Sequence, residues 1–310
     1  MRIRATVAAV SGALALSAFA IPGAHAADAS AASRADVAKV QEAARAASGK
    51  AAFSTSSAAD TGTPYTLDLS FSNVKVNNGK PIVAGISNKV TAPVTFTVTH
   101  GADVDITAAD TYIDLEIYRG TYDEPENVLF GDDFPSCTAT STTVASCKGT
   151  IDVYPDTDLV NADAATWKAI GYAVAWNGVN PDSDDIDWSK VGYVDQDALA
   201  TTKLQRYSKL TVNAGPEPVT KGKTLTATGK LTRANWETHS YKGYTNQPVK
   251  LQFRKAGTST YTTIKTVTSD SYGNVKATTT ASTDGYWRFR FEGTSTTPAV
   301  SATGDYVDVK

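Results

Sequence analysis

The chain has 310 residues, with 29 basic and 32 acidic side chains and a formal net charge of -3 at neutral pH. This mild acidity gives no electrostatic attraction to phosphate, so nucleic acid is not an expected partner. Beyond the N-terminal region, no apolar run approaches the roughly 20 residues that a membrane-spanning helix needs.

Residues 1–26 are typical of a secretory signal peptide. They begin with the basic run MRIR, continue with a short apolar stretch, and end with AHA at Ala24 to Ala26, which suits a cleavage site. The mature chain is therefore expected to begin at Ala27, with 27 basic and 32 acidic residues. It is expected to be secreted and extracellular, with no membrane span.

Residues 27–64 are rich in Ala, Ser, Thr and Gly and offer too little apolar surface for a core. We predict a flexible arm here, within which ADVAKVQEAARAA could form a short helix.

From Tyr65 the pattern changes to the alternation of half-buried strands, in LDLSF, VTFTV, IDLEI and IGYAVAW. The apolar residues of each run share one face, and Trp176 falls on such a face. The acids at the alternate positions, among them Asp68, Asp114 and Glu116, are expected to be ordinary surface charge. Residues 65–203 are predicted to form a first β-sandwich.

The two cysteines, Cys137 and Cys147, are separated by nine Thr, Ser, Ala and Val residues that suit two strands and a turn. In an oxidising compartment this spacing predicts a local disulfide. A metal site would lack further ligands, and a redox motif would need a two-residue spacing.

An acidic segment, residues 177–200, holds six aspartates against the single basic residue Lys190. Spaced carboxylates are what calcium requires, so four of them are candidate ligands: Asp182, Asp184, Asp185 and Asp187. The match to an EF-hand is poor, because Ile186 stands at a ligand position and no glutamate closes the loop. A solvated acidic loop is the alternative.

Trp188 and Trp236 lie in predicted loops and are not explained by a strand core. They are candidates for aromatic contact with sugars, since exposed aromatic side chains mark contact surfaces.

Residues 204–310 contain seven short strand patterns, the number and spacing expected of an immunoglobulin-like sandwich. They are SKLTV, KTLTATGKL, PVKLQFR, YTTIKTV, GNVKATTTA, YWRFRF and DYVDV. Pro216 and Pro218 are expected at an edge or a strand switch.

This last third of the chain resembles the C-terminal immunoglobulin-like domain of secreted proteins from Streptomyces and related actinobacteria, a family whose members are mostly uncharacterised. The resemblance includes a Gly-containing turn before an aromatic strand, at Asp284, Gly285, Tyr286 and Trp287. It implies fold, secretion and lineage, and it transfers no catalytic residue.

In such a sandwich PVKLQFR would be strand C and YWRFRF strand F, which are neighbours in one sheet. Their outward side chains would form a basic patch, with strand G adding Tyr306, Asp308 and Lys310. The patch would consist of Lys250, Arg254, Tyr286, Arg288 and Arg290. It would suit the anionic polymers of a Gram-positive cell wall. Alternatively, it is a charged outer face in which Asp308 pairs with an arginine.

No catalytic site is expected. The mature chain has two histidines, His100 and His239, in predicted turns, and it lacks a nucleophile elbow and a zinc helix motif. Acids on solvent-facing strand positions do not indicate the fixed carboxylate pair that a glycosidase needs.

The sequence therefore predicts an all-β chain of two immunoglobulin-like β-sandwiches behind a flexible arm. The predicted function is a secreted, monomeric or weakly associating, non-catalytic binding or structural module that attaches to wall polymer, polysaccharide or a protein partner and needs no cofactor. The alternatives are a calcium-stabilised extracellular module and an exported hydrolase or hydrolase inhibitor.

Overall fold

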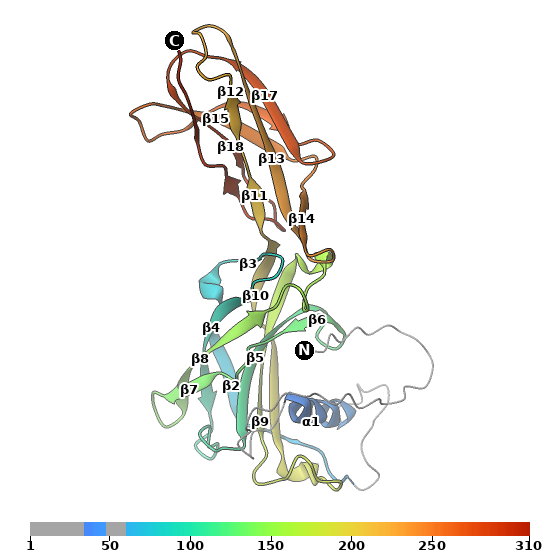
Figure 1. Cartoon of the computed structure of the whole chain (residues 1–310). Helices are drawn as coiled ribbons and strands as arrows, with labels where there is room; N and C mark the ends of the chain where they lie inside the picture. Colours follow the sequence, from blue (N-terminus) through green and yellow to red (C-terminus); the bar gives the residue numbers. More distant parts are fainter. Residues whose placement is uncertain (1–33, 48–59) are drawn as a thin grey trace, which may run out of the picture.

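The computed structural model describes residues 34–47 and 60–310. The predicted signal peptide and the remainder of the predicted arm up to residue 59 lie outside the described residues. The described chain folds into two β-sandwiches placed end to end, with one α-helix against the first (Figure 1). The prediction of an all-β fold with two sandwiches is confirmed.

Two sheets build the first sandwich. One has the order β2 (Leu69–Val76), β4 (Val90–His100), β8 (Val144–Val153), β7 (Ser136–Ala139). The other has the order β1 (Tyr65–Thr66), β10 (Gly192–Arg206), β9 (Thr166–Ala175), β5 (Thr111–Gly120), β6 (Pro125–Leu129), and β3 (Ile82–Ala84) pairs with β10.

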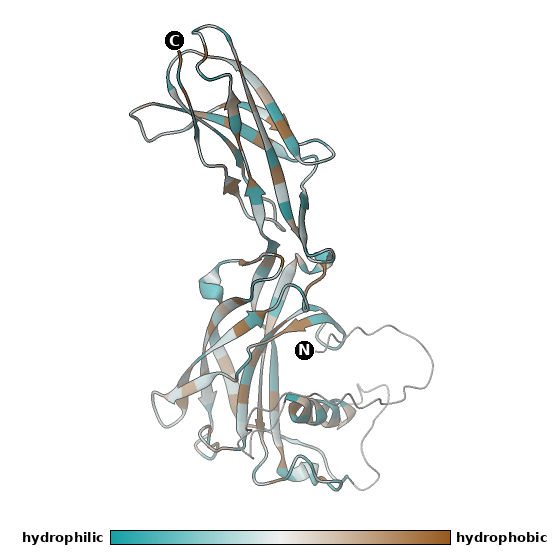
Figure 2. Ribbon diagram, in the orientation of Figure 1, coloured by the Kyte–Doolittle hydropathy of each residue, from teal (hydrophilic) through white to brown (hydrophobic). Residues whose placement is uncertain are grey.

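The core between these sheets follows the alternation of the sequence. Phe71 on β2, Phe96 on β4 and Leu115 on β5 are each at most 3% exposed and belong to one cluster. Figure 2 shows hydrophobic and hydrophilic residues alternating along the strands. Cys137 on β7 and Cys147 on β8 face each other in the ladder and form a disulfide, which confirms the predicted pairing.

The adjacent strands β5 and β9 are buried on both faces. Tyr172 and Val174 of β9 point away from the core between the sheets. Together with Trp176, which directly follows β9, they form another cluster with Val37 and Val40. These two valines belong to α1 (Arg34–Ala47), which lies along this outer face (Figure 1). The expectation of half-buried strands is therefore wrong for β5 and β9, because a helix covers their second face.

Local sequence explains why α1 forms and how it docks. Val37, Val40 and Ala44 recur at helical spacing and supply one apolar stripe. Asp36 in the first turn and Arg45 in the last turn complement the helix dipole. A helix of 14 residues is marginal alone, so packing decides its stability. This part of the predicted flexible arm is an ordered helix.

The second sandwich has the immunoglobulin-like strand order. One sheet contains β11 (Ser208–Leu210), β13 (Thr224–Asn235) and β12 (Asn213–Gly215), with β14 (Ser240–Gly243) and β17 (Asn274–Thr280) on β13. The other contains β16 (Thr262–Thr268), β15 (Pro248–Lys255), β18 (Gly285–Phe291) and β19 (Val300–Ser301), with β20 (Asp305–Val307) on β18. Between them lie Trp287, Phe289 and Phe291 of β18.

Pro216 and Pro218 lie at a strand switch, as predicted. The chain before them, β12, pairs with β13 of one sheet. The chain after them forms a parallel bridge from Val219 to Val309, at the end of the chain that follows β20. Proline has no N–H for a ladder, so it suits this transition.

The two sandwiches meet around Trp236. β10 of the first sandwich ends at Arg206 and β11 of the second begins at Ser208, so the boundary lies slightly after the predicted residue 203. Trp236 is 0% exposed and joins the core cluster of the first sandwich. Its indole N–H donates to the carbonyl of Gly85 at 2.7 Å, and Arg206 Nε donates to the carbonyl of Ala234 at 2.5 Å.

Candidate functional site

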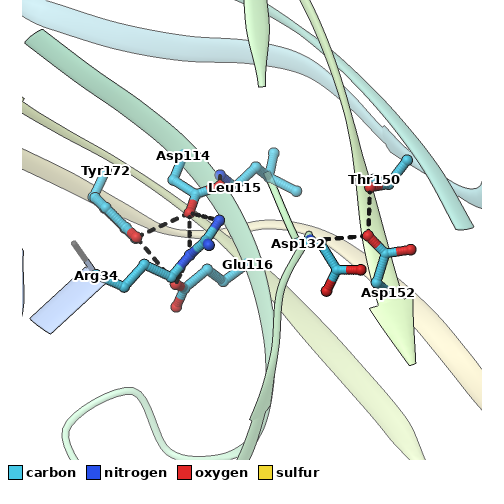
Figure 3. Close-up of polar contacts among 8 residues, drawn as sticks. All are labelled: Arg34, Asp114, Leu115, Glu116, Asp132, Thr150, Asp152 and Tyr172. Atoms are coloured by element: carbon cyan, nitrogen blue, oxygen red, sulfur yellow. Dashed lines mark hydrogen bonds and ion pairs between the residues drawn. The ribbon is translucent and has the colours of Figure 1, made fainter. Parts of the chain in front are cut away.

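A buried acidic site lies where α1 meets the outer face of β5 and β9 (Figure 3). Asp114 and Glu116 are two residues apart on β5 and therefore share a face, and Tyr172 stands opposite Asp114 on β9. The side chains of Asp114 and Glu116 are 1% and 16% exposed. The expectation that these acids are ordinary surface charge is wrong, because α1 covers them.

Arg34, the first residue of α1, enters this acidic site. Its Nε and Nη2 atoms donate to Oδ2 of Asp114 at 2.9 and 2.7 Å, and Nε lies 3.8 Å from Oε1 of Glu116. The guanidinium carbon also lies 4.6 and 4.5 Å from the ring centroids of Phe130 and Phe134. The site therefore holds a guanidinium between carboxylates and aromatic faces, which is favourable for a partly desolvated cation.

The protonation of the site follows from its burial. Burial, helped by the charge of Asp114, raises the pKa of Glu116 to about 8. Burial also raises the pKa of Tyr172 well above its ordinary value. Burial raises the pKa of Asp114 as well, and the adjacent Arg34 opposes this rise. At neutral pH the site therefore contains a neutral Tyr172 and a mainly neutral Glu116 beside the Arg34–Asp114 contact.

The geometry of Tyr172 agrees with a protonated Glu116. The Tyr172 hydroxyl oxygen lies 3.0 Å from Oδ2 of Asp114 and 3.0 Å from Oε1 of Glu116. A hydroxyl has one hydrogen, so it can donate to one of these acids, and a protonated Glu116 supplies the hydrogen for the other contact.

A second buried acid fixes the loop between β6 and β7, which carries the two phenylalanines. Asp152 on β8 accepts hydrogen bonds from the Asp132 N–H at 2.9 Å and from Thr150 Oγ1 at 2.9 Å (Figure 3). It also accepts from Thr91 Oγ1 at 2.7 Å. Burial opposes the ionisation of Asp152, but these bonds and Lys89 outweigh it and hold the pKa of Asp152 below its usual range. This acid has a structural role.

The acidic site is suited to recognition. While α1 is docked, Asp114 is out of reach of solvent and its Oδ2 atom is engaged by Arg34. Neither carboxylate is presented in an open reaction centre. What the arrangement can do chemically is bind a guanidinium group and hold the helix that carries it.

The residues of the predicted basic patch lie on two paired strands of the second sandwich. On the paired strands β15 and β18, Lys250 stands opposite Arg290, and Arg254 opposite Tyr286. Arg288 stands opposite Gln252, and its Nε donates to Oε1 of that residue at 2.9 Å. The adjacency of strands C and F that the sequence predicted is confirmed.

Half of the patch is neutralised by an acid that sequence analysis missed. Glu292, directly after β18, lies 2.9 Å from Nζ of Lys250 and 3.1 Å from Nε of Arg290. The alternative interpretation paired Asp308 with an arginine, and in the structure Asp308 forms an ion pair with Lys310 instead, at 3.5 Å. The sequence did contain a signal for Glu292, because it lies two residues after Arg290 and therefore shares the outer face with Arg288 and Arg290.

The other half of the patch carries two arginines without a carboxylate partner among the described residues. The guanidinium carbon of Arg288 lies 3.7 Å from the ring centroid of Tyr261, and that of Arg254 lies 4.0 Å from the ring centroid of Tyr286. Tyr306, which is 41% exposed, packs against Tyr286 with ring centroids 5.2 Å apart. Sequence analysis gave Tyr261 no role. This residue directly precedes β16, and the pairing of β15 with β16 contains a register shift next to Leu251 that alternation does not predict.

The four aspartates proposed as calcium ligands are engaged separately or exposed. Asp187 caps the short 3-10 helix Trp188–Lys190 by accepting from Ser189 N and Oγ, and it pairs with Lys190 at 3.2 Å. Asp182 lies 3.9 Å from Nζ of Lys39 on α1. Asp184 and Asp185 are exposed. Within the described ranges no group of three or more His, Cys, Asp or Glu residues is placed to hold a metal ion. The calcium-stabilised alternative stays a prediction from sequence, and this arrangement of the four aspartates does not favour it.

Trp188 and Trp236 are both in the interior, at 5% and 0% exposure. Trp188 packs against Trp176 beneath α1, with ring centroids 6.2 Å apart, and Trp236 fills the contact between the sandwiches. The prediction that these loop tryptophans are exposed for contact with sugars is wrong, because a loop position does not exclude burial under a neighbouring element.

None of the helices that the structure describes has the length and apolar character needed to cross a bilayer.

No family model and no curated protein matches the sequence. Among solved structures, the chain is similar to the ectodomain of mouse nectin-like molecule 4, at 12% identity over 79% of this chain and 65% of that one, with a TM-score of 0.21. It is also similar to the Yersinia pseudotuberculosis adhesin InvE, at 14% identity over 77% and 60%, with a TM-score of 0.23. The Escherichia coli adhesin FdeC matches at 11% identity over 78% and 65%, with a TM-score of 0.28.

The chain spans 60 to 65% of the length of these three structures. At this identity and TM-score they bring no function to the chain. The immunoglobulin-like assignment rests on the strand order of its own second sandwich.

Proposed function

We propose that the chain is an extracellular, non-catalytic binding module whose second sandwich binds an anionic polymer of the cell wall. The observation that carries this proposal is the pair of arginines, Arg254 and Arg288, which lie on tyrosine rings and have no carboxylate partner among the described residues. The binding surface is the outer face of β15, β18 and β20.

Preorganisation supports this surface. A guanidinium that already lies flat on an aromatic ring loses less side-chain entropy when it binds than one that extends into water. Arg254 also donates to the carbonyl of Thr258, and Arg288 to Gln252, which fixes both groups further. Each retains N–H groups that can donate to phosphate or carboxylate oxygens.

Charge supports it too. The whole chain is mildly acidic, yet this face keeps more basic than acidic side chains even after Glu292 neutralises part of it. A polymer with regularly spaced anions can contact both arginines at once. The overall affinity then exceeds that of either single contact.

The test is cosedimentation of the mature chain with purified Gram-positive cell walls at increasing salt. We expect retention to fall as salt rises, because exposed charges are screened. The double change Arg254→Ser and Arg288→Ser should weaken retention by about tenfold or more. The matched control is Lys221→Ser with Lys223→Ser, which removes two exposed basic residues elsewhere on the same sandwich.

Walls stripped of their phosphate polymers distinguish the source of the anions. Loss of binding on stripped walls assigns the ligand to phosphate, and retained binding assigns it to wall carboxylates. Binding that ignores salt, or that falls equally in both double variants, would overturn the proposal.

A further inference from the structure

The sheet face that α1 covers has the composition of an interaction surface. It presents the acidic site and, beside it, buried aromatic and aliphatic side chains: Tyr112, Tyr172, Val174, Trp176, Ile186, Trp188, Val191 and Tyr193. Without α1, this face would expose a large apolar patch with Asp114 and Glu116 at one end. Large exposed apolar patches mark binding sites in soluble proteins.

We propose that this face is an exchangeable helix-docking site, and that its partner in trans is α1 of a second copy of the chain. This proposal concerns the first sandwich and is independent of anion binding by the second.

Complementary charge and shape define what the face recognises. Arg34 pairs with Asp114, and Val37 and Val40 follow at three-residue intervals on the same side of the helix. Arg45, in the last turn, has its guanidinium carbon 5.2 Å from the ring centroid of Tyr122. Basic side chains at both ends of α1 therefore meet the face, with an apolar stripe between them.

The docked helix leaves part of this face poorly satisfied. Among the described residues, the indole N–H groups of Trp176 and Trp188 have no hydrogen-bond partner, although the two side chains are 1% and 5% exposed. A buried donor without an acceptor destabilises the docked state. Towards the C-terminal end of the helix, a pocket of about 390 Å³ is lined by Gln41 and Arg45 of α1 and by Tyr193 and Asp195 of β10.

The helix itself offers few large apolar side chains to this face. Val37 and Val40 are its buried hydrophobic residues, and Ala43 and Ala44 are partly buried. Small side chains bury little apolar area, so they contribute little free energy to docking. An element held in this way belongs to the low-stability end of a fold and opens before the core does.

A second copy fits because it needs no new contacts. The same helix can dock in cis or in trans, and reciprocal exchange between two copies closes a symmetric pair. The twelve residues from 48 to 59 connect α1 to the sandwich. A chain of that length gives the helix an effective concentration on the order of millimolar, so trans docking competes only at similar local densities.

The first arm of the test measures capture of the helix. A fluorescent peptide of residues 27–50 is titrated against the mature chain that carries Arg34→Ala, whose own helix is weakened while its face is intact. We expect binding at least about tenfold tighter than to the wild-type chain, where the resident helix competes. The Val40→Ser chain is a second variant, in which docking of α1 is weakened while Arg34 is kept as the partner of Asp114. It should give the same result.

Matched peptides test the recognition. The Arg34→Ala peptide should bind at least about tenfold more weakly, because it cannot pair with Asp114. The Ala38→Gln peptide, changed at an exposed helical position, should bind as the wild-type peptide does. Absence of binding up to about 1 mM, equal binding to the wild-type chain, or binding that ignores Arg34 overturns the helix-docking site.

The second arm tests the partner. The Arg34→Ala chain is mixed with the wild-type chain at a concentration near 1 mM, and the species are measured by sedimentation equilibrium. Mixed dimers are expected, and the Arg34→Ala chain alone should stay monomeric. If the peptide binds but no mixed dimer forms, a second copy is not the partner, and that part of the proposal is overturned.

Discussion

Arg34 and Asp114 are 80 residues apart in the sequence, yet one oxygen of Asp114 accepts two hydrogen bonds from the Arg34 guanidinium, at 2.7 and 2.9 Å. The contact joins the N-terminal helix to the middle of a β-sheet. It also makes Asp114, which alternation places on an outer face, the acid of a buried ion pair. The stability of the first sandwich therefore depends on a residue before the predicted sandwich begins.

Arg34→Ala should destabilise the first sandwich. Removal of one partner from a buried pair costs about 3–5 kcal/mol when the other charge stays buried. Undocking of α1 would let water reach Asp114, so the measured loss in the free energy of unfolding should not exceed the free energy of docking. Chemical denaturation and hydrogen exchange should show a lower midpoint and faster exchange over residues 34–47.

The control is Ala38→Gln, at an exposed position of the same helix, which should leave both readings unchanged. The double variant Arg34→Ala with Asp114→Asn should recover part of the loss, because no uncompensated charge remains. A double variant less stable than Arg34→Ala would contradict the ion-pair explanation.

Glu116 should make the stability of the first sandwich depend on pH. Its pKa in the folded protein is about 8, above the ordinary value of 4.5, because burial favours the neutral form. A group with a raised pKa contributes stability that is complete below its unfolded pKa and lost as pH rises through its folded pKa. The temperature or denaturant midpoint of unfolding should therefore decrease as the pH is raised from about 4.5 to about 8.

Glu116→Gln should flatten this slope, since the amide stays neutral throughout. Glu124→Gln, at an exposed position, is the matched control and should retain the wild-type slope. Parallel pH profiles for wild type and Glu116→Gln would show that this carboxyl is not the group responsible.

The second sandwich was the more predictable from sequence, for a physical reason. Its central strand β18 alternates strictly between a buried and an outer face, so pairing β15 with β18 fixes the place of Arg254 and Arg288. Alternation shows which side chains share a face. It does not show which outer charge Glu292 neutralises, because that depends on rotamers.

In the first sandwich the same logic assigned the face correctly and the exposure wrongly. Asp114 and Glu116 do lie on the side of β5 opposite Leu115, but α1 covers that side. A signal was present, because Val37, Val40 and Ala44 form an apolar stripe that needs a partner. Trp236 gave no such signal, since a contact between two domains leaves no period in the sequence.

Loss of the disulfide should weaken the edge of the first sandwich. Cys137 and Cys147 join β7 to β8 and close a short loop with a sequence separation of 10. A disulfide of this kind restricts the unfolded chain and typically contributes about 2–4 kcal/mol. We expect Cys137→Ser with Cys147→Ser to lower the free energy of unfolding by up to this amount.

A reductant supplies the comparison for this variant. It should lower the midpoint of the wild-type protein and leave that of the double serine variant unchanged. A wild-type midpoint that is insensitive to complete reduction would show that the bridge contributes nothing to stability.

Calcium should leave the unfolding midpoint unchanged. Asp187 is engaged in capping a short helix, and Asp182 lies near Lys39, so the aspartates of residues 177–200 do not converge on one point. Thermal unfolding with calcium and with a chelator measures this directly, because a ligand that binds only the folded state raises the midpoint. A rise of several degrees that disappears with Asp184→Asn and Asp185→Asn would reverse the expectation and assign a calcium site.

Trp236→Ala should uncouple the two sandwiches. The side chain is fully buried in the contact between them, and its indole N–H bonds to the Gly85 carbonyl. Truncation of a buried tryptophan costs about 3–5 kcal/mol, and here it also leaves that carbonyl without this donor. We expect calorimetry to resolve two transitions for this variant and a single coupled transition for the wild type.

Trp236→Phe separates the contribution of the buried ring from that of the hydrogen bond to the Gly85 carbonyl. It keeps most of the buried ring and removes the hydrogen bond, so it should cost about 1–3 kcal/mol and leave the transitions coupled. Trp287, in the core of the second sandwich, provides a contrast: Trp287→Ala should destabilise that sandwich without loosening the contact between the two. Equal separation of the transitions in the Trp236→Ala and Trp287→Ala variants would contradict a specific role for Trp236 in the interface.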